Sequence, residues 1–287
     1  MKIVGIDEIP LMRGLEHRGG TFHSQTTAEG RPGTIGNFKF SLSRLGTDYS
    51  GPRHRHNFDQ FRYMLEGESD YGDGKLSAGH LGYYPEGVPY GPQVNKTPIV
   101  SAVLQFGGAS GSGYLLPREV KAGMEELKAF GEFKDGIFHR RDGTGKRNMD
   151  AYQAIWEHVH GREMIYPKGR YDAPIFMNAA NYDWAPVSGA PGVSEKLFGV
   201  WTERRTEAGL LRLDAGARLE AKGRGIYFVL SGAGACEGKA LRLHSTVFVD
   251  SGERAILSAS EPMDVLHYGL SNLTDMEAAV NISAAAE

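Results

Sequence analysis

The stretch GPRHRHNFDQFRYMLEG, residues 51–67, contains two histidines one residue apart, His54 and His56, followed by Gln60. Side chains of a β-strand alternate between its two faces, so we expect both histidines to point to the same side. Two imidazoles on one face of a strand can share a cation, each at about 2.0–2.1 Å. The stretch therefore predicts a metal site on a strand. The alternative is that both histidines hydrogen-bond, or act as acid and base, without a metal.

The same stretch continues with a charged residue, Arg62. On a strand that restarts at Gln60, Arg62 shares its face with Gln60 and Met64. A guanidinium inside a folded domain is costly unless it is paired. Two roles therefore remain open for Arg62: a clamp for a substrate carboxylate or enolate, or an internal ion pair with an Asp or Glu. Asp59 is expected to turn outward in the loop before this strand.

The segments around this stretch alternate between β-rich and helical character. Residues 34–116 contain short apolar runs separated by Gly and Pro clusters, which is typical of strands joined by turns. Residues 117–161 instead predict two helices separated by a charged, Gly-containing loop, KDGIFHRRDGTGKRN. Pro117 stands at the expected first turn of the first helix, and Gly161 at the expected end of the second. From residue 170 onward the strand pattern returns. We therefore expect two β domains, at residues 1–116 and 170–287, joined by a helical connector at residues 117–169.

Size and composition exclude several functional classes. The chain has 287 residues, 40% of them hydrophobic, and a formal net charge of −3. This weak charge gives no electrostatic reason to expect nucleic acid or an anionic membrane as a partner. No apolar run approaches the ~20 residues of a membrane helix, and the N-terminus has no signal-peptide core. A single cysteine, Cys236, excludes an internal disulfide framework. We expect a cytoplasmic protein.

The motif around His54 resembles the first motif of the cupin superfamily, G(X)5HXH(X)3,4E(X)6G. The stretch HRHNFDQFRYMLEG supplies both histidines and the closing Gly67 at matching positions, with Gln60 where the family has glutamate. A second cupin motif, G(X)5PXG(X)2H(X)3N, matches residues 79–94. There Tyr90 replaces the last histidine and Val94 replaces the asparagine. The resemblance covers both β-rich halves and implies an all-β bicupin, with two jelly-roll β-barrels and a helical connector.

An internal repeat agrees with two related barrels. Residues 63–87 can be laid over residues 228–252 without a gap, which aligns Gly67 with Gly232 and Gly87 with Gly252. Extended further, the alignment places Leu219, Ala221, Gly225 and Ala255 opposite His54, His56, Gln60 and Tyr90, respectively. None of the four counterparts can bind a metal. The second barrel is therefore expected to be structural.

The resemblance implies a divalent metal ion on His54, His56 and Gln60, with Fe(II) favoured and Zn, Mn or Ni as alternatives. Gln60 offers only a neutral oxygen, and Tyr90 binds a metal only as phenolate, so the site should hold its ion weakly. Tyr90 and Arg62 are the expected catalytic residues. A hydroxyl of Tyr90 that is hydrogen-bonded within the barrel wall is the alternative.

Three functions are compatible with this site. The first is a non-haem dioxygenase that acts on a small anionic organic substrate, since Fe(II) with two histidines leaves positions for O₂. The second is an isomerase or cyclase that uses acid–base chemistry. The third is a non-catalytic protein that binds a small molecule. A homodimer is an expected assembly, on resemblance to cupins alone.

Overall fold

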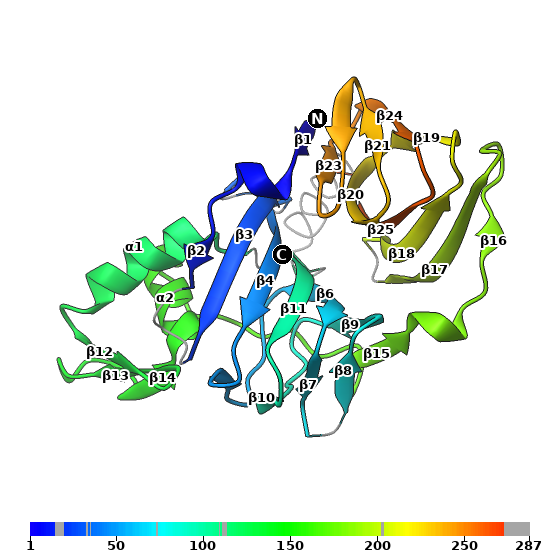
Figure 1. The fold of residues 1–287 in the computed structure, drawn as a ribbon. Helices are drawn as coiled ribbons and strands as arrows, with labels where there is room; N and C mark the ends of the chain where they lie inside the picture. Colours follow the sequence, from blue (N-terminus) through cyan, green and yellow to red (C-terminus); the bar gives the residue numbers. More distant parts are fainter. Residues whose placement is uncertain are drawn as a thin grey trace. The chain divides into compact units, whose positions relative to one another are not determined.

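A computed structural model describes the chain in two compact units (Figure 1). The first unit spans Leu11–Met177, and the second combines Met1–Pro10 with Asn178–Glu287. The described residues are 1–14, 20–32, 34, 36–72, 74–108, 110, 114–201 and 204–272.

These units differ from the domains expected from the sequence. The expected connector at residues 117–169, here called the helical segment, is not a separate part of the chain. Its side chains share a buried core with Phe58 and Tyr114, so it belongs to the first unit. The first ten residues belong to the second unit, because strand β1 (Lys2–Val4) pairs with strand β23 (Thr246–Val249). The boundary predicted at residue 170 lies at Met177–Asn178 instead. Among the described residues, no helix is long and apolar enough to cross a membrane.

The first unit contains a large sheet of seven strands in the order β15-β9-β6-β11-β4-β3-β2. Its strands are β2 Met12–Arg13, β3 Phe22–Glu29, β4 Phe38–Leu45, β6 Asp59–Glu66, β9 His80–Tyr84, β11 Ile99–Phe106 and β15 Ile175–Asn178. A second sheet has the order β5-β10-β7-β8. Its strands are β5 Ser50–Gly51, β7 Glu68–Asp70, β8 Lys75–Ser77 and β10 Gln93–Asn95.

The two sheets enclose a core between them, as two layers of a barrel do. Met64 and Leu45 from the large sheet pack with Leu76 from the small sheet, and Tyr84 and Tyr90 join the same buried cluster. Because side chains alternate along a strand, Met64 and Leu45 identify which faces of β6 and β4 line the interior.

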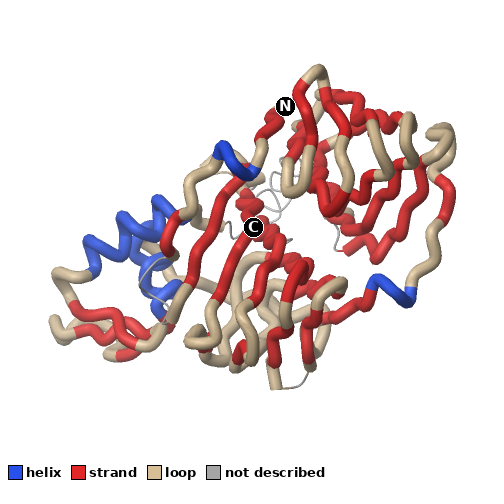
Figure 2. The backbone as a smooth tube through the Cα atoms, viewed as in Figure 1, coloured by secondary structure: helices blue, strands red, loops and turns tan. Residues whose placement is uncertain are grey.

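The helical segment of the first unit has two helices, α1 (Pro117–Leu127) and α2 (Ala151–His160). Pro117 occupies the first turn of α1 as predicted, and Gly161 ends α2 in the left-handed conformation with φ of 62°. The expected loop between the helices instead forms a small antiparallel sheet. Its strands are β12 Gly131–Lys134, β13 Ile137–Arg140 and β14 Asn148–Asp150. Figure 2 shows both helices in blue beside the red strands of this unit.

The second unit repeats the two-sheet arrangement. Its sheets have the orders β1-β23-β20-β25-β18-β17-β16 and β19-β24-β21-β22. The remaining strands are β16 Ala185–Pro186, β17 Val193–Trp201, β18 Thr206–Leu213, β19 Arg218–Lys222, β20 Arg224–Ser231, β21 Gly234–Cys236, β22 Lys239–Leu241, β24 Arg254–Ala259 and β25 Met263–Leu270. The described part of this unit also contains two short 3-10 helices, Ile6–Glu8 and Ala179–Asn181.

The aligned glycines support the internal repeat. Gly67 and Gly232 both have a left-handed backbone, with φ of 77° and 78°. A Cβ added to Gly67 would lie 2.5 Å from the carbonyl oxygen of Pro98, and one added to Gly232 would lie 2.1 Å from that of Pro262. Both positions therefore require glycine for the same two reasons, which indicates that these turns are equivalent in the two barrels.

Candidate functional site

The two cupin-like motifs meet in the first unit through a backbone bridge between His54 and Tyr90. The His54 N–H donates to the Tyr90 carbonyl at 3.0 Å, and the Tyr90 N–H donates to the His54 carbonyl at 2.9 Å. The His54 ring centroid lies 4.6 Å from that of Tyr90 and 4.9 Å from that of His56. His54 and His56 precede β6 and are not part of a regular strand, contrary to our expectation. Their rings nevertheless lie together, beside Tyr90.

A hydrogen bond sets the tautomer of His54. Its Nδ1 lies 2.6 Å from the carbonyl oxygen of Pro52. A carbonyl oxygen only accepts, so Nδ1 carries the hydrogen and, in the neutral ring, Nε2 carries the lone pair. Metal-binding histidines commonly have this arrangement, in which the second ring nitrogen donates to a backbone carbonyl.

His56 is more buried than His54, and aromatic rings surround it. Its ring stacks on Phe58 at 4.2 Å, and Tyr152 lies edge-on at 6.4 Å. The Tyr90 hydroxyl is 3.4 Å from His56 Nε2, at the long end of the hydrogen-bond range. The pair is therefore close enough for a proton to pass between phenol and imidazole after a small movement.

Gln60 is buried on the interior face of β6, and its amide belongs to a chain of polar groups. Its Oε1 accepts a hydrogen bond from Gln105 Nε2 at 2.9 Å, while Gln105 Oε1 accepts one from the Tyr114 hydroxyl at 2.8 Å. Gln60 Nε2 is buried and has no partner among the described residues. Turning both amides over keeps both bonds if Tyr114 accepts, and it releases the Gln60 oxygen for a ligand. In the orientation described here, Gln60 offers a donor rather than a metal ligand.

Arg62 has no acidic partner in the described part of the chain. Its Nη1 donates to the Tyr71 hydroxyl at 2.6 Å and to Gln93 Oε1 at 3.1 Å, and its guanidinium carbon lies 5.6 Å from the Tyr84 ring centroid. The internal ion pair considered from the sequence is thus not found among these residues. A permanent positive charge held by neutral groups favours the alternative, an anion clamp.

Sequence reasoning missed Lys39, which lies on β4. Lys39 is only 7% exposed, and it shares the interior face of β4 with Leu45. Burial lowers the pKa of Lys39 to about 8, and the charge of Glu29 opposes this shift. In NFKFSLSRL, lysine and serine alternate with phenylalanine and leucine, and this pattern predicts a strand with two unlike faces. The pattern does not indicate that the polar face lines the barrel.

A buried acidic pair lies on the other face of β6. Asp59, expected to turn outward, is the first residue of β6 and is 1% exposed. Its Oδ1 accepts from the Glu86 N–H at 2.8 Å and from the Tyr83 hydroxyl at 3.3 Å. Burial and the neighbouring Glu86 carboxylate raise the pKa of Asp59 to about 7. Glu86 in turn accepts from Arg170 Nη1 at 3.2 Å.

The donor set of the site fits a weakly held divalent ion. Among the described residues, no group of three or more His, Cys, Asp and Glu side chains could hold a metal. The candidate ligands are the two imidazoles, with the Tyr90 phenol and the Gln60 amide as further donors. All of these groups are neutral in their ordinary forms, so the remaining coordination positions would fall to water or substrate. This donor set suits an open site better than a structural one.

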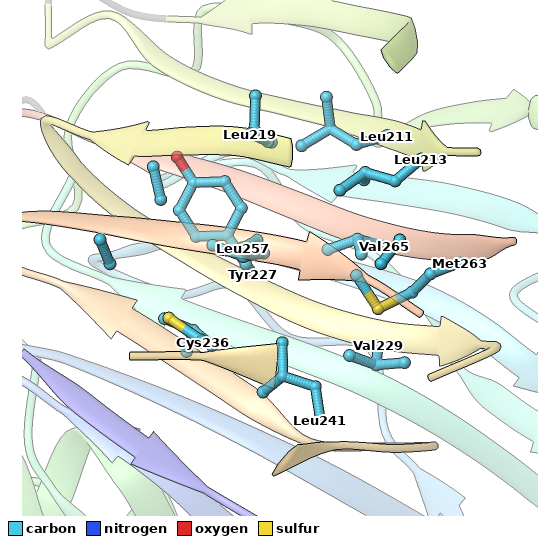
Figure 3. Packing of buried hydrophobic residues seen from close by; sticks show 14 of the residues in the cluster. Leu211, Leu213, Leu219, Tyr227, Val229, Cys236, Leu241, Leu257, Met263 and Val265 are labelled. Atoms are coloured by element: carbon cyan, nitrogen blue, oxygen red, sulfur yellow. The ribbon is translucent and has the colours of Figure 1, made fainter. Parts of the chain in front are cut away.

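The second barrel carries no comparable chemistry at the aligned positions. Leu219, Ala221 and Ala255 lie within a buried apolar cluster that fills this barrel. Figure 3 shows Leu219 close to the ring of Tyr227, with Leu211 and Leu257 nearby. The interior is therefore occupied by side chains of the protein itself, unlike the polar face of β6 in the first unit.

No protein-family model matches the chain, and no curated protein matches it by sequence. Solved structures do match. A "putative dioxygenase" from Nostoc punctiforme has a TM-score of 0.64 at 10% identity, covering 94% of this chain and 82% of its own. A variant of Bacillus subtilis oxalate decarboxylase has a TM-score of 0.56 at 15% identity, covering 95% and 78%. The same enzyme at pH 4.6 gives 0.55 at 16% identity, covering 95% and 76%. At these identities the likeness shows the fold alone: this chain is an all-β protein with two barrels of the cupin fold, and its helical segment belongs to the first unit.

Proposed function

We propose that the first barrel is the active site of a metal-dependent cupin enzyme that acts on a small anionic organic molecule. The observation that carries this proposal is the meeting of His54, His56 and Tyr90 across a backbone bridge, beside an interior that holds Arg62 without an acidic partner among the described residues. The imidazoles supply neutral nitrogen donors, and Arg62 supplies the charge that an anion requires.

Each residue has a distinct role in this proposal. His54 presents Nε2 to the ion, because its Nδ1 donates to Pro52. His56 is the second ligand, and Gln60 is the third if both amides turn over. Arg62 binds a substrate carboxylate or enolate oxygen through charge-assisted hydrogen bonds. Tyr90 donates a proton or hydrogen bond to the reacting oxygen. A bound divalent ion would polarise substrate oxygen or, as Fe(II), activate O₂.

We favour a non-haem dioxygenase among the cupin chemistries. Two histidine ligands and no carboxylate leave several coordination positions for O₂ and substrate. The structural neighbour from Nostoc punctiforme, described as a "putative dioxygenase", supports this choice at the level of the fold. Fe(II) is the favoured ion, with Zn, Mn and Ni as alternatives.

Elemental analysis of the purified protein tests the metal. We expect an isolated or reconstituted protein with one divalent ion per chain, and a His54→Ala, His56→Ala variant that binds none. A His158→Ala, His160→Ala variant, which changes an equally spaced pair on α2, is the matched control and should keep the ion. Protein that cannot be reconstituted, or a double variant that keeps its ion, would contradict the assignment. Oxygen uptake with a panel of small organic acids then separates an oxygenase from other chemistry.

One observation favours a second function, an isomerase or cyclase. The Tyr90 hydroxyl and His56 Nε2, 3.4 Å apart, form a phenol–imidazole pair that can serve as acid and base without an ion. Turnover that persists in metal-free protein, without oxygen uptake, would support this alternative. A protein that binds small anions and converts none would instead be a non-catalytic binding cupin.

A further inference from the structure

Lys39 is a second positive charge inside the first barrel. Strand β4 pairs with β11 without a register shift from Phe38 to Leu45, so Lys39 lies on the same face as Leu45. Leu45 belongs to the core between the two sheets. Lys39 therefore points into the interior that also receives Arg62, and it is 7% exposed.

The register of the large sheet places Lys39 in one row with the polar chain described above. Lys39 lies opposite Gln105, and Gln105 lies opposite Gln60. Directly opposed residues have Cβ atoms about 4.5–5.5 Å apart, so the row Lys39–Gln105–Gln60 is a continuous polar strip. Gln60 ends this strip beside Tyr84, its partner on β9. A ligand seated against the strip would meet the Lys39 amine at one end.

No described carboxylate neutralises Lys39. The acid opposite it is Glu29 on β3, and the Glu29 carboxylate pairs with Arg118 at 2.7 Å. No oxygen of a described acidic residue lies within salt-bridge distance of the Lys39 amine, although Glu29 is close enough to attract it. A buried ammonium without a counter-ion destabilises a fold, and such groups persist where they have a function.

The geometry of the large sheet sets the distance between Lys39 and Arg62. Arg62 lies two residues beyond Gln60 on β6, and Gln60 lies in the same row as Lys39 but two strands away. With strand spacings of about 4.8 Å and about 3.4 Å per residue, their Cα atoms lie about 12 Å apart. Both side chains are long and enter the same interior. Val103 and Ser41, which face that interior between them, carry no charge.

We propose that Lys39 and Arg62 bind the two anionic ends of a dianionic substrate, in the class of linear dicarboxylates of about four to six carbons. This inference rests on the proposed function only in placing the substrate in the first barrel. One carboxylate pairs with the Arg62 guanidinium, which Tyr71 and Gln93 hold in position. The other pairs with the Lys39 ammonium. Gln105 and Gln60, between the two charges, offer hydrogen bonds to the substrate chain.

Calorimetric titration with paired acids tests the inference. Succinate is compared with butyrate, glutarate with pentanoate and adipate with hexanoate, using the purified full-length protein. For at least one pair we expect the dicarboxylate to bind at least about tenfold more tightly, as one added charge-assisted contact gives. Lys39→Gln should remove this difference and leave binding of the monocarboxylate unchanged. Lys39→Arg should retain part of it, and Lys128→Gln, an exposed lysine on the helical segment, should retain all of it.

The titrations are repeated with the His54→Ala, His56→Ala variant, so that coordination to a metal cannot produce the difference. Discrimination that survives in this variant supports the role of Lys39 even if the metal assignment fails. Equal binding of both members of every pair, or no binding of either, overturns the inference. Loss of mono- and dicarboxylate binding by the same factor in Lys39→Gln overturns it as well. Circular dichroism of each variant verifies that it is folded.

Discussion

His54 and Tyr90 are joined by two backbone hydrogen bonds, so the position of the Tyr90 ring beside the histidines does not depend on its hydroxyl. These backbone hydrogen bonds form whatever side chain residue 90 carries. Substitutions at Tyr90 that keep an aromatic ring should therefore change the chemistry of the site without moving its parts.

Tyr90→Phe should retain the metal and lose turnover. If Tyr90 is the proton donor, as proposed, its removal lowers the rate by about 10²–10⁴-fold, while the two proposed imidazole ligands stay in place. Metal content by elemental analysis and turnover with an identified substrate are the measurements. Tyr152→Phe is the control, because the Tyr152 ring also faces His56 but its hydroxyl bonds the Leu115 N–H. Loss of the ion in Tyr90→Phe would instead identify the phenol as a ligand.

Gln60→Glu should strengthen metal binding. A carboxylate adds the negative charge that the present donor set lacks, and charge count is a main determinant of cation affinity. We expect the dissociation constant for Mn²⁺ or Zn²⁺ to fall by about tenfold or more in calorimetric titration. Gln105→Glu adds the same charge one strand away and is the matched control. An unchanged constant in Gln60→Glu would show that residue 60 does not reach the ion.

Lys39→Met should stabilise the first unit at neutral pH. Because burial lowers the pKa of Lys39 from 10.5 to about 8, the folded state binds fewer protons than the unfolded state between these values. The wild type therefore gains stability as pH rises from about 8 to 10.5. Below pH 8 its folded state carries the full free-energy cost of the buried ammonium. We expect the variant to gain up to about 3 kcal/mol at pH 7 and progressively less above pH 8.

Denaturant unfolding followed by Trp156 fluorescence measures this gain, in a background where Trp184 and Trp201 of the second unit are changed to Phe. Lys128→Met, at an exposed position, should show no such dependence on pH. A loss of stability in Lys39→Met across the whole range would mean that its ammonium has a partner in the fold.

Asp59→Asn should stabilise the first unit near and above neutral pH. Folding raises the pKa of the wild-type Asp59 carboxyl from 3.8 to about 7, so between these pH values the folded state binds more protons than the unfolded state. Wild-type stability falls as pH rises from about 4 to 7, by up to about 4 kcal/mol. Asparagine mimics the protonated acid and removes this slope.

The measurement is the difference in unfolding free energy between variant and wild type, taken at several values from pH 4 to 8. The difference should grow with pH and level off above pH 7. Asp172→Asn, at an exposed site of the same unit, serves as the control. A difference that does not change with pH would show that Asp59 is ionised throughout.

Leu257→Ala should destabilise the second barrel and leave the proposed metal site intact. Leu257 is fully buried in the apolar cluster of that barrel, and removing such a side chain costs about 2–5 kcal/mol. Trp184 and Trp201 fluorescence reports the second unit, and elemental analysis reports the first. The exposed Leu243→Ala is the matched control. A coupled loss of metal would mean that the second barrel supports the site.

The sequence predicts those residues of the candidate site that lie close together in the chain at a characteristic spacing. His54, His56 and Gly67 lie within one stretch, and Tyr90 follows from a second motif at fixed spacing. Lys39 could not be found in this way. It reaches the interior through the register of β4 on β11, a pairing between residues about sixty positions apart in the chain. Alternation gave the two faces of β4 correctly, but only tertiary structure decides which face is enclosed.

Asp59 illustrates the same limit at shorter range. A carboxylate after a loop is ordinarily solvated, and that rule predicts an outward side chain. The structure buries it because the Glu86 N–H and the Tyr83 hydroxyl, from the neighbouring β9 and the turn after it, both donate to one oxygen. The helices were predicted well because Pro117 and Gly161 act locally. The β12–β14 sheet between them was not predicted, because this segment is rich in charged residues and glycine, a composition that predicts a loop.

The pairing of β1 with β23 makes the first barrel an insertion within the second. Residues 2–4 are synthesised long before residues 246–249, their partner strand in β23. During synthesis, this edge of the second barrel therefore cannot form until β23 has left the ribosome. A fragment beginning at Asn178 would leave the outer edge of β23 unpaired, open to another strand.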